Sequence, residues 1–349
     1  MRPSRKMEHI RFALEQGTAG TNGLRDVLPL PSNLPELALD SVSLATSFGE
    51  LTLSSPIVVN AMTGGAEETE RINRKLAEAA AACGLAMAVG SQMAALRDSR
   101  VEESYRVVRR THPHGVLFAN LGSEASVDQA KRAVDMLEAN ALQIHLNVMQ
   151  ELVMPEGDRD FRGARSRIEA IVKSLDVPVI VKEVGFGMTA DTARQLAELG
   201  VALVDVGGRG GTDFANIENA RRPEPLEWLT GWGLPTAVSL LETVPCYPSG
   251  HVMASGGLQH SLDIVAALVL GASAAGMAGK LLRVLQDEET AGLISFLKKT
   301  EEGVRLLMTA LGASTIPELW KVSAVISGRT ADWCRERGID TTAYAQRVR

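Results

Sequence analysis

The residues of this 349-residue chain most able to do chemistry form a glycine-rich set that recurs at three places. Short apolar runs end there in GGRGGT (207–212), ASGG (254–257) and GMAG (276–279). Glycine lets main-chain N–H groups approach an anion without obstruction from a side chain, so these endings predict a phosphate site. A single Gly-Gly pair is more often an ordinary turn. Three such endings on neighbouring strands favour a ligand.

A buried lysine is expected at Lys182, which lies inside the apolar run 178–184. A buried ammonium needs an anionic partner, because an unpaired charge is costly to remove from water. A reduced flavin ring, a substrate carboxylate or a phosphate could supply that anion. The alternative is an internal salt bridge, for example to Asp205 on the next strand.

A third group of polar residues lies in the segment HLNVMQE (145–151). A carboxamide beside a carboxylate, Gln150 and Glu151, suits a Mg²⁺ ion that keeps several waters and bridges to phosphate oxygens. The alternative for Glu151 is a charge that stabilises the start of a helix. His145 is equally compatible with a hydrogen-bonded core histidine and with a catalytic side chain.

The N-terminus carries a basic cluster that includes His9, one acidic residue (Glu8) and four cationic residues: Arg2, Arg5, Lys6 and Arg11. Four positive charges and one negative charge give a local formal charge of +3, in a chain whose net charge is −6. Such a cluster suits a diphosphate, although a solvated basic helix end has the same composition.

The elements that must position these residues are eight short apolar runs, each ending in polar residues or glycine. Runs of this length predict buried strands, and the helix-period stretches between them, such as 67–84, 126–140 and 189–200, predict crossover helices. The pattern indicates an α/β fold, a TIM (β/α)₈ barrel whose active site lies at the carboxyl ends of its strands. The predicted strands are 56–62, 85–91, 116–122, 141–147, 178–184, 203–208, 251–257 and 274–279.

The fourth run indicates which face of a strand points inward. Gln143, His145 and Asn147 share one face with a period of two, and the residues between them are Leu142, Ile144 and Leu146. We expect the apolar face to contact the surrounding helices and the polar face to point into the barrel.

The barrel is expected to span 56–285, between an N-terminal extension (1–55) and C-terminal helices (286–349) of the same domain. The extension contains a charged helix candidate (4–16) and a segment (40–48) that could form a short hairpin at the barrel floor. Long crossovers at 150–163 and 209–235 are typical of active-site loops. The tail is expected to form two helices, 288–312 and 316–335, which pack on the barrel or make subunit contacts.

Composition excludes several classes of protein. A net charge of −6 and 4% aromatic residues argue against a nucleic-acid-binding surface. No apolar stretch approaches the roughly 20 residues that span a bilayer, and the N-terminus lacks the apolar core of a signal peptide. Three cysteines without metal-type spacing make a disulfide framework unexpected. We expect a cytoplasmic protein with no membrane partner and no nucleic-acid partner.

Eleven motifs along the chain resemble those of the type 2 isopentenyl-diphosphate isomerases, flavin-dependent barrel enzymes of isoprenoid synthesis. The glycine and lysine motifs alone would point only to flavin barrels, whereas RKxEH together with HLNxxQE is specific to this family. Arg209, between the glycine pairs, is at a position expected to vary. The motifs are RKMEHI (5–10), NAMTGG (60–65), AVGSQM (88–93), FANLGSE (118–124), QIHLNVMQE (143–151), MPEGDRDF (154–161), PVIVKEVGFGM (178–188), DVGGRGGTDFANIE (205–218), ASGGLQ (254–259), GMAG (276–279) and LMTALGA (307–313).

The resemblance implies a set of site residues. Glu151 would hold Mg²⁺, and His145 and Gln150 would be catalytic beside reduced FMN. The substrate diphosphate would contact Arg5, Lys6, His9 and Gln150. The cofactor FMN would contact Ala61, Met62, Thr63, Ser91, Asn120, Lys182, Thr212, Gly256, Gly257, Ala278 and Gly279.

The resemblance also implies a reaction, the conversion of isopentenyl diphosphate to dimethylallyl diphosphate. Reduced FMN would serve as acid and base, and its electron-rich ring would stabilise positive charge developing at C3. NADPH would be a transient reductant, because the net redox change is zero. The family usually assembles as four or eight subunits, so a homo-oligomer is expected.

The main alternative is an FMN-dependent oxidoreductase of the 2-hydroxy-acid or inosinate dehydrogenase kind. The first needs a histidine base near an arginine, and neither His251 nor His260 has an arginine within three residues. The second needs a nucleophilic cysteine in a loop at the barrel top, whereas Cys246 precedes a predicted strand. A flavin sensor that is not an enzyme would leave the N-terminal basic pair and the pair of Gln150 and Glu151 unexplained.

Overall fold

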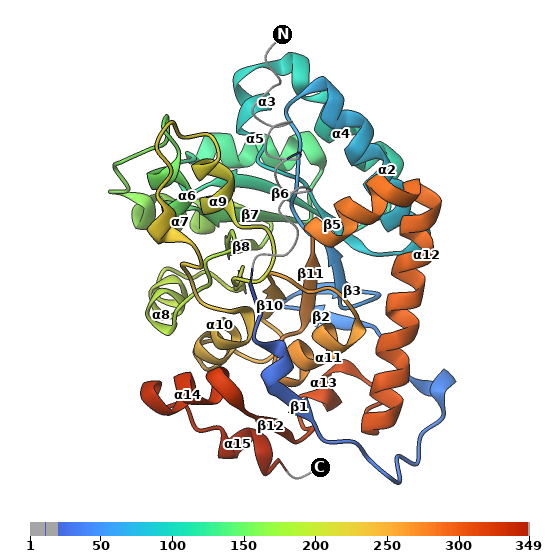
Figure 1. Ribbon diagram of the computed structural model, residues 1–349. Helices are drawn as coiled ribbons and strands as arrows, with labels where there is room; N and C mark the ends of the chain where they lie inside the picture. The colour runs from blue at the N-terminus through green and yellow to red at the C-terminus, as the bar shows by residue number, and fades with distance from the viewer. Residues whose placement is uncertain (1–10, 12–19, 348–349) are drawn as a thin grey trace.

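The computed structural model describes residue 11 and residues 20–347, and its centre is a closed parallel barrel of eight strands (Figure 1). The strands follow one another around the barrel in chain order, and β11 closes it against β4. Each predicted run contains one strand, so the predicted TIM barrel is confirmed. The strands are β4 (Ile57–Val59), β5 (Ala86–Ala88), β6 (Leu117–Gly122), β7 (Ala141–Leu146), β8 (Val179–Glu183), β9 (Leu203–Asp205), β10 (Val252–Ser255) and β11 (Ala274–Met277).

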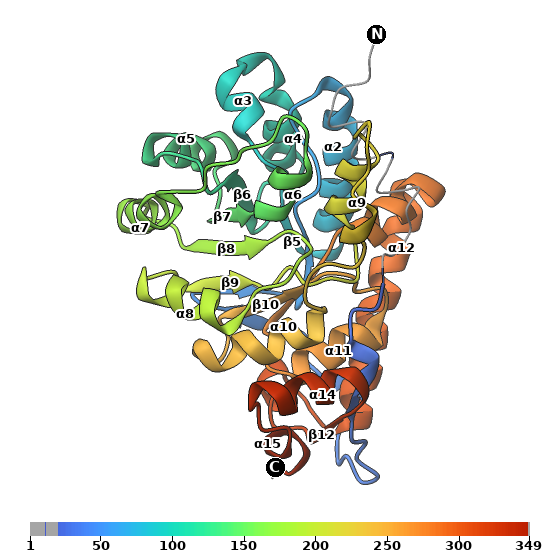
Figure 2. The same ribbon diagram turned by 60° about the vertical axis from the view of Figure 1, so that its left-hand side comes forward.

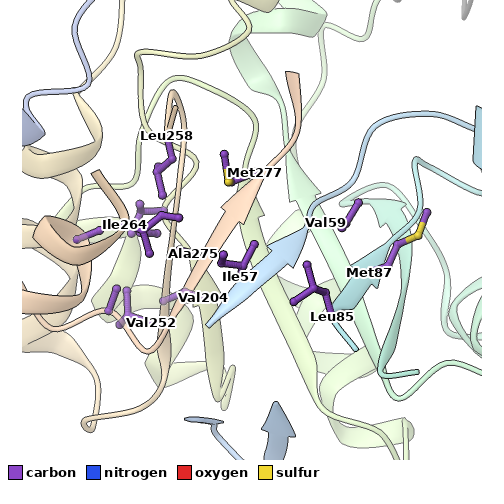
Figure 3. Packing of buried hydrophobic residues seen from close by; sticks show 14 of the residues in the cluster. Ile57, Val59, Leu85, Met87, Val204, Val252, Leu258, Ile264, Ala275 and Met277 are labelled. Atoms are coloured by element: carbon purple, nitrogen blue, oxygen red, sulfur yellow. The ribbon is translucent and has the colours of Figure 1, made fainter. Parts of the chain in front are cut away.

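The alternation expected for the fourth run is present in β7. Leu142 and Ile144 belong to the large apolar cluster between the strands and the outer helices, part of which Figure 3 shows beside α11. Gln143, between these two residues, is fully buried and forms hydrogen bonds with Asn120 of β6 and with Asn60, which directly follows β4. The apolar face therefore contacts the helices and the polar face points into the barrel, as predicted.

Helices cover the outside of the barrel, and β8 and β9 run side by side toward the end where α6 and α9 lie (Figure 2). The predicted helices 67–84, 126–140 and 189–200 correspond to α2, α5 and α8. Between the barrel strands lie α2 (Glu67–Cys83), α3 (Met93–Arg97), α4 (Glu103–Thr111), α5 (Val127–Leu137), α6 (Val148–Val153), α7 (Ala164–Ser174), α8 (Ala190–Glu198), α9 (Phe214–Asn219), α10 (Thr236–Thr243) and α11 (Ser261–Val269).

A hairpin closes the end of the barrel at which the strands begin, called the lower end below. Its strands are β2 (Thr46–Phe48) and β3 (Leu51–Leu53), so it lies slightly later in the chain than the predicted segment 40–48. Phe48 and Leu53 are buried against the lower interior residues of the strands, among them Phe118. The hairpin is the predicted barrel floor.

The C-terminal region differs from the prediction of two helices. Helix α12 (Gly279–Leu311) has a break at Glu289, where the backbone φ is 58°. Beyond it lie α13 (Ile316–Leu319), β12 (Ala324–Ile326), α14 (Gly328–Arg337) and α15 (Thr342–Ala345). The single helix expected over 316–335 is therefore wrong.

The physical reason is a partner distant in the sequence. Strand β12 pairs antiparallel with β1 (Val27–Pro29), and Ala324 and Ile326 are buried while Val325 is exposed. This short alternating segment can satisfy its main-chain hydrogen bonds only because the N-terminal extension lies beside it. Figure 1 shows the two strands together at the end of the molecule that also holds α14 and α15.

Most of the helix candidate 4–16 lies outside the described residues. The boundaries at 55 and 285 stay a prediction. Among the residues that the structure describes, no helix has an apolar stretch long enough to cross a membrane.

Candidate active site

A cavity of about 720 Å³ lies at the carboxyl ends of the barrel strands. Its volume is within the roughly 300–1,000 Å³ typical of small-molecule sites. The structure brings all the predicted site residues that it describes into this one cavity: Ala61, Met62, Thr63, Ser91, Asn120, His145, Gln150, Glu151, Lys182, Thr212, Gly256, Gly257, Ala278 and Gly279. The predicted substrate contacts Arg5, Lys6 and His9 lie outside the described residues.

The main chain of the glycines after β9 packs directly against the main chain of the glycines after β10. Gly256 has a backbone φ of +108°, and a Cβ there would overlap the carbonyl group of Gly208. Gly257 has a φ of +76°, and a Cβ there would overlap Gly210. Because neither position tolerates a side chain, this wall of the cavity is formed by peptide groups, as a phosphate cradle requires.

The first turn of α12 extends the same wall. Gly279 begins this long helix, and both Gly279 and the preceding Ala278 line the cavity. The first N–H groups of a helix have no partner within the helix, and the helix dipole favours an anion beside them. Thr212 reaches the same place, since a Cβ on Gly279 would lie 3.1 Å from its hydroxyl oxygen. The arrangement fits a phosphate.

After β4, the strand that pairs with β11, Thr63 presents a polar atom that needs a ligand. Its side chain is 2% exposed, and its hydroxyl has no hydrogen-bond partner within the described part of the chain. A buried polar group without a partner is uncommon and costs stability. The Tyr105 hydroxyl donates to the carbonyl of the adjacent Ser91, and burial raises the pKa of Tyr105, so the phenol stays a neutral donor. The Thr63 hydroxyl in the cavity lining therefore fits the polar edge of a cofactor.

Within the part of the chain that the structure describes, no carboxylate forms a salt bridge with the buried ammonium of Lys182, although the charge of Glu183 lies near it. Its Nζ donates to the main-chain carbonyl of Glu183 at 2.7 Å, and no acidic side chain of the described residues lies within ion-pairing distance. The alternative salt bridge to Asp205 is absent there, because the Asp205 carboxylate accepts from Asn60 and Ser255. A cation at 7% exposure that lines a cavity fits an anionic ligand.

Sequence reasoning missed the role of Glu183. One oxygen of its carboxylate accepts main-chain N–H bonds from all four following residues, 184–187, at 2.5–3.2 Å. Burial raises its pKa to about 7, although these hydrogen bonds act in the opposite direction. Glu183 thereby shapes the loop after β8. The glycines of the motif KEVGFG were the sequence signal for a tight turn at this position.

The polar residues after β7 are held in defined orientations. The Gln150 amide donates to the buried carboxylate of Glu218 on α9 at 3.1 Å. The two helices α6 and α9 lie in contact, which explains how residues 68 apart meet. The carboxylate of Glu218 therefore determines which end of the Gln150 amide faces it, and sequence reasoning had assigned Glu218 no role.

Glu151 accepts from the Asn147 side chain at 2.8 Å and from the main-chain N–H of Asp158 at 2.9 Å. Burial, and to a smaller extent the carboxylates of Glu151 and Asp158, raise the pKa of Glu124 nearby. No group of three or more acidic, histidine or cysteine ligands occurs in the described residues. Mg²⁺ usually keeps several waters and takes only one or two protein carboxylates, so the Glu151 carboxylate in the cavity lining fits such an ion.

Two comparisons identify the family of this chain. Residues 69–325 match the family model described as FMN-dependent dehydrogenase. An isopentenyl-diphosphate delta-isomerase of Bacillus pumilus is 53% identical over 348 residues, which cover 99% of this chain and 98% of that protein. One of a Geobacillus species is 51% identical over 347 residues, which cover 99% of both.

Solved structures share the fold at low sequence identity. A mandelate oxidase carrying an FMN adduct has a TM-score of 0.64 at 19% identity, covering 90% of this chain and 95% of that one. A lactate oxidase of Pediococcus acidilactici has a TM-score of 0.67 at 14% identity, covering 94% and 96%. These likenesses support the barrel alone, whereas the full-length identity to the isomerases is decisive. The chain belongs to the type 2, flavin-dependent family of isopentenyl-diphosphate delta-isomerases.

Proposed function

We propose that this protein converts isopentenyl diphosphate to dimethylallyl diphosphate with reduced FMN and Mg²⁺. The observation that carries the proposal is the gathering, in one cavity, of the glycine cradle, Lys182, His145 and Glu151. The cradle and the lysine fit a phosphorylated anionic cofactor, and the carboxylate fits a metal-bound diphosphate. The full-length similarity to the isomerases supports this substrate.

FMN would be held at its phosphate by Thr212, Gly256, Gly257, Ala278 and Gly279, and along its ring by Ala61, Met62, Thr63, Ser91, Asn120 and Lys182. When bound and reduced, FMN supplies acid–base chemistry and an electron-rich ring. Lys182 would neutralise negative charge at the ring edge, because its ammonium is buried without a carboxylate partner among the described residues.

The substrate would be oriented by residues above this cofactor site. Glu151 would hold Mg²⁺ against the diphosphate, and Arg5, Lys6 and His9 would contact the same group. Gln150 and His145 would line the space where the double bond moves, and would orient the substrate and hold protons there. NADPH as reductant and a tetramer or octamer belong to the same proposal and rest on the family resemblance, whereas the cytoplasmic location rests on composition.

An oxidoreductase acting on 2-hydroxy acids finds no support in the site. His251 precedes β10 at the lower end of the barrel, and His260 is the N-cap residue of α11, with half of its side chain exposed. Neither histidine lines the cavity. An oxidoreductase of the inosinate dehydrogenase kind would need a cysteine in a loop at the barrel top. Cys246 instead lies before β10, in contact with α10 and the start of α8.

One anaerobic experiment tests the proposal. Full-length protein loaded with FMN and reduced with dithionite is mixed with isopentenyl diphosphate and Mg²⁺ in D₂O. We expect catalytic formation of deuterated dimethylallyl diphosphate, and none with oxidised flavin. Formation of product by the oxidised enzyme would overturn the role of reduced FMN. Reduction of the flavin by lactate or mandelate, without isomerisation, would favour the oxidoreductase.

A further inference from the structure

A line of buried amide side chains crosses the upper interior of the barrel and ends at His145. Asn60 directly follows β4, Asn120 lies within β6 and Gln143 within β7, and each is less than 5% exposed. The hydrogen-bonded chain runs from Asp205 through Asn60, Gln143 and Asn120 to the imidazole, with donor–acceptor distances of 2.8, 3.0, 3.1 and 2.8 Å. Two of its members, Asn60 and Asn120, line the cavity together with His145.

The orientation of the first amide is determined by groups that can act in only one way. The main-chain N–H of Ala61 can only donate, and it bonds to Asn60 Oδ1 at 2.9 Å. The Asn60 nitrogen must therefore be the atom that faces the carboxylate of Asp205, and a carboxylate oxygen accepts it. Asp205 is held in turn by the Ser255 hydroxyl and the Gly207 N–H.

Each following amide then has one possible orientation. Gln143 must present its nitrogen to Asn60 Oδ1, so its oxygen accepts from the Asn120 nitrogen. Asn120 is left with its oxygen toward His145 Nδ1, at 2.8 Å. An oxygen cannot donate, so Nδ1 must carry the hydrogen.

We propose that Gln143 is a positioning residue that holds His145 in its Nδ1–H form, so that Nε2 is the nitrogen that acts in the cavity. The assignment of the hydrogen stands on the hydrogen-bonded chain alone. The effect on catalysis rests on the proposed isomerase function. Gln143 is fully buried, does not line the cavity and acts through Asn120.

The hydrogen position is tested by ¹⁵N NMR of histidine-labelled full-length protein above the pH range where histidine titrates. The chain has six histidines, so His145→Ala assigns the signal. We expect Nδ1 of His145 to be the protonated nitrogen in the wild type. Gln143→Leu should release the Asn120 amide and give a mixture or the Nε2–H form.

Two further variants keep this test decisive. Gln143→Glu, protonated at this buried position, retains an oxygen that accepts from Asn120 and supplies an O–H that donates to Asn60 Oδ1, so it should keep the Nδ1–H form and rescue the effect of leucine. Thr46→Val removes one buried hydrogen bond, from Thr46 Oγ1 to Ser273 at the barrel floor, and should leave His145 unchanged. A protonated Nε2 and bare Nδ1 in the wild type, or an unaltered signal in Gln143→Leu, would overturn the proposal.

Kinetics test the catalytic part. Gln143→Leu should lower kcat roughly 10- to 100-fold, the size typical of lost support for a site residue, with KM changed by less than about threefold. In a His145→Ala background the same change should have no further effect, because it acts through that ring. Equal losses in both backgrounds would contradict this. If the wild type does not isomerise the substrate, the proposed function fails, and the NMR result still decides the hydrogen position.

Discussion

The lower and upper halves of the barrel interior are built by the same strands from residues only two positions apart. On each of five strands an apolar residue below is followed by a polar one above, in the pairs Val58 and Asn60, Phe118 and Asn120, Ala141 and Gln143, Leu203 and Asp205, and Met253 and Ser255. All ten side chains are buried. Burial alone therefore does not separate the structural layer from the functional one.

The two layers are stabilised differently. In the lower layer, apolar side chains pack against the floor hairpin, and their contribution depends on area and shape. In the upper layer, each buried polar atom must find a partner of the opposite kind, and leaving one unpaired costs about 1–3 kcal/mol. We expect the lower layer to tolerate small changes of side-chain shape better than polar substitutions. We expect the upper layer to tolerate neither kind of change.

The largest effect is expected from Phe118→Ala in the lower layer. Phe118 is fully buried, so truncation should reduce the free energy of unfolding by about 3–5 kcal/mol through lost burial and a cavity. Urea unfolding followed by circular dichroism measures it. Phe118→Leu should recover most of the loss, and a loss as large in leucine as in alanine would show that aromatic shape, rather than volume, is required.

Gly276→Ala tests the upper layer with a single methyl group. A Cβ there would lie 2.6 Å from Asn60 Nδ2, and should push the amide away from Asp205. We expect a loss of about 1–3 kcal/mol in unfolding free energy, although the residue added is apolar and small. The same urea experiment measures it, and a neutral outcome would mean that the upper layer is as adaptable as an apolar core.

Gly256→Ala tests the cradle above this layer. The change meets both a backbone φ of +108° and the Gly208 carbonyl, so FMN affinity should fall at least about tenfold. Flavin fluorescence titration measures the affinity. Gly338→Ala is the matched control, because its φ is +68° and a Cβ there meets nothing within 4 Å. Similar flavin affinity in both variants would show that the glycine cradle does not bind FMN.

The smallest effect is a pH dependence at Glu183. Its pKa is raised to about 7 in the folded protein, above the ordinary value of 4.5, so the folded state binds the proton more tightly. Its contribution to stability is present below pH 4.5 and is lost as the pH rises through about 7. Glu183→Gln should flatten the stability profile between these values, as thermal melts across that range would show. If stability depended on pH in Glu183→Gln as it does in the wild type, another group would be the one that binds the proton.

The barrel and the lining of its cavity could be predicted because they depend on local patterns. Apolar runs of four to eight residues specify strands, and the polar residue after each run must lie at the carboxyl end. The same reasoning identified the glycine-rich endings, Lys182 and the segment 145–151, whereas the family resemblance supplied Ala61, Met62, Thr63, Ser91 and Asn120. The helix predicted over 316–335 failed because β12 depends on a partner almost 300 residues earlier in the chain.

What the sequence by itself determined is the face that each residue presents, since strand and helix periods are local properties of the chain. What only the tertiary structure decided is which buried polar atoms meet. Asn60 and Asp205 are 145 residues apart, and Gln150 reaches Glu218 only because α6 packs on α9. A hydrogen bond needs a donor and an acceptor within about 3 Å, and only closure of the barrel brings such distant groups to that distance.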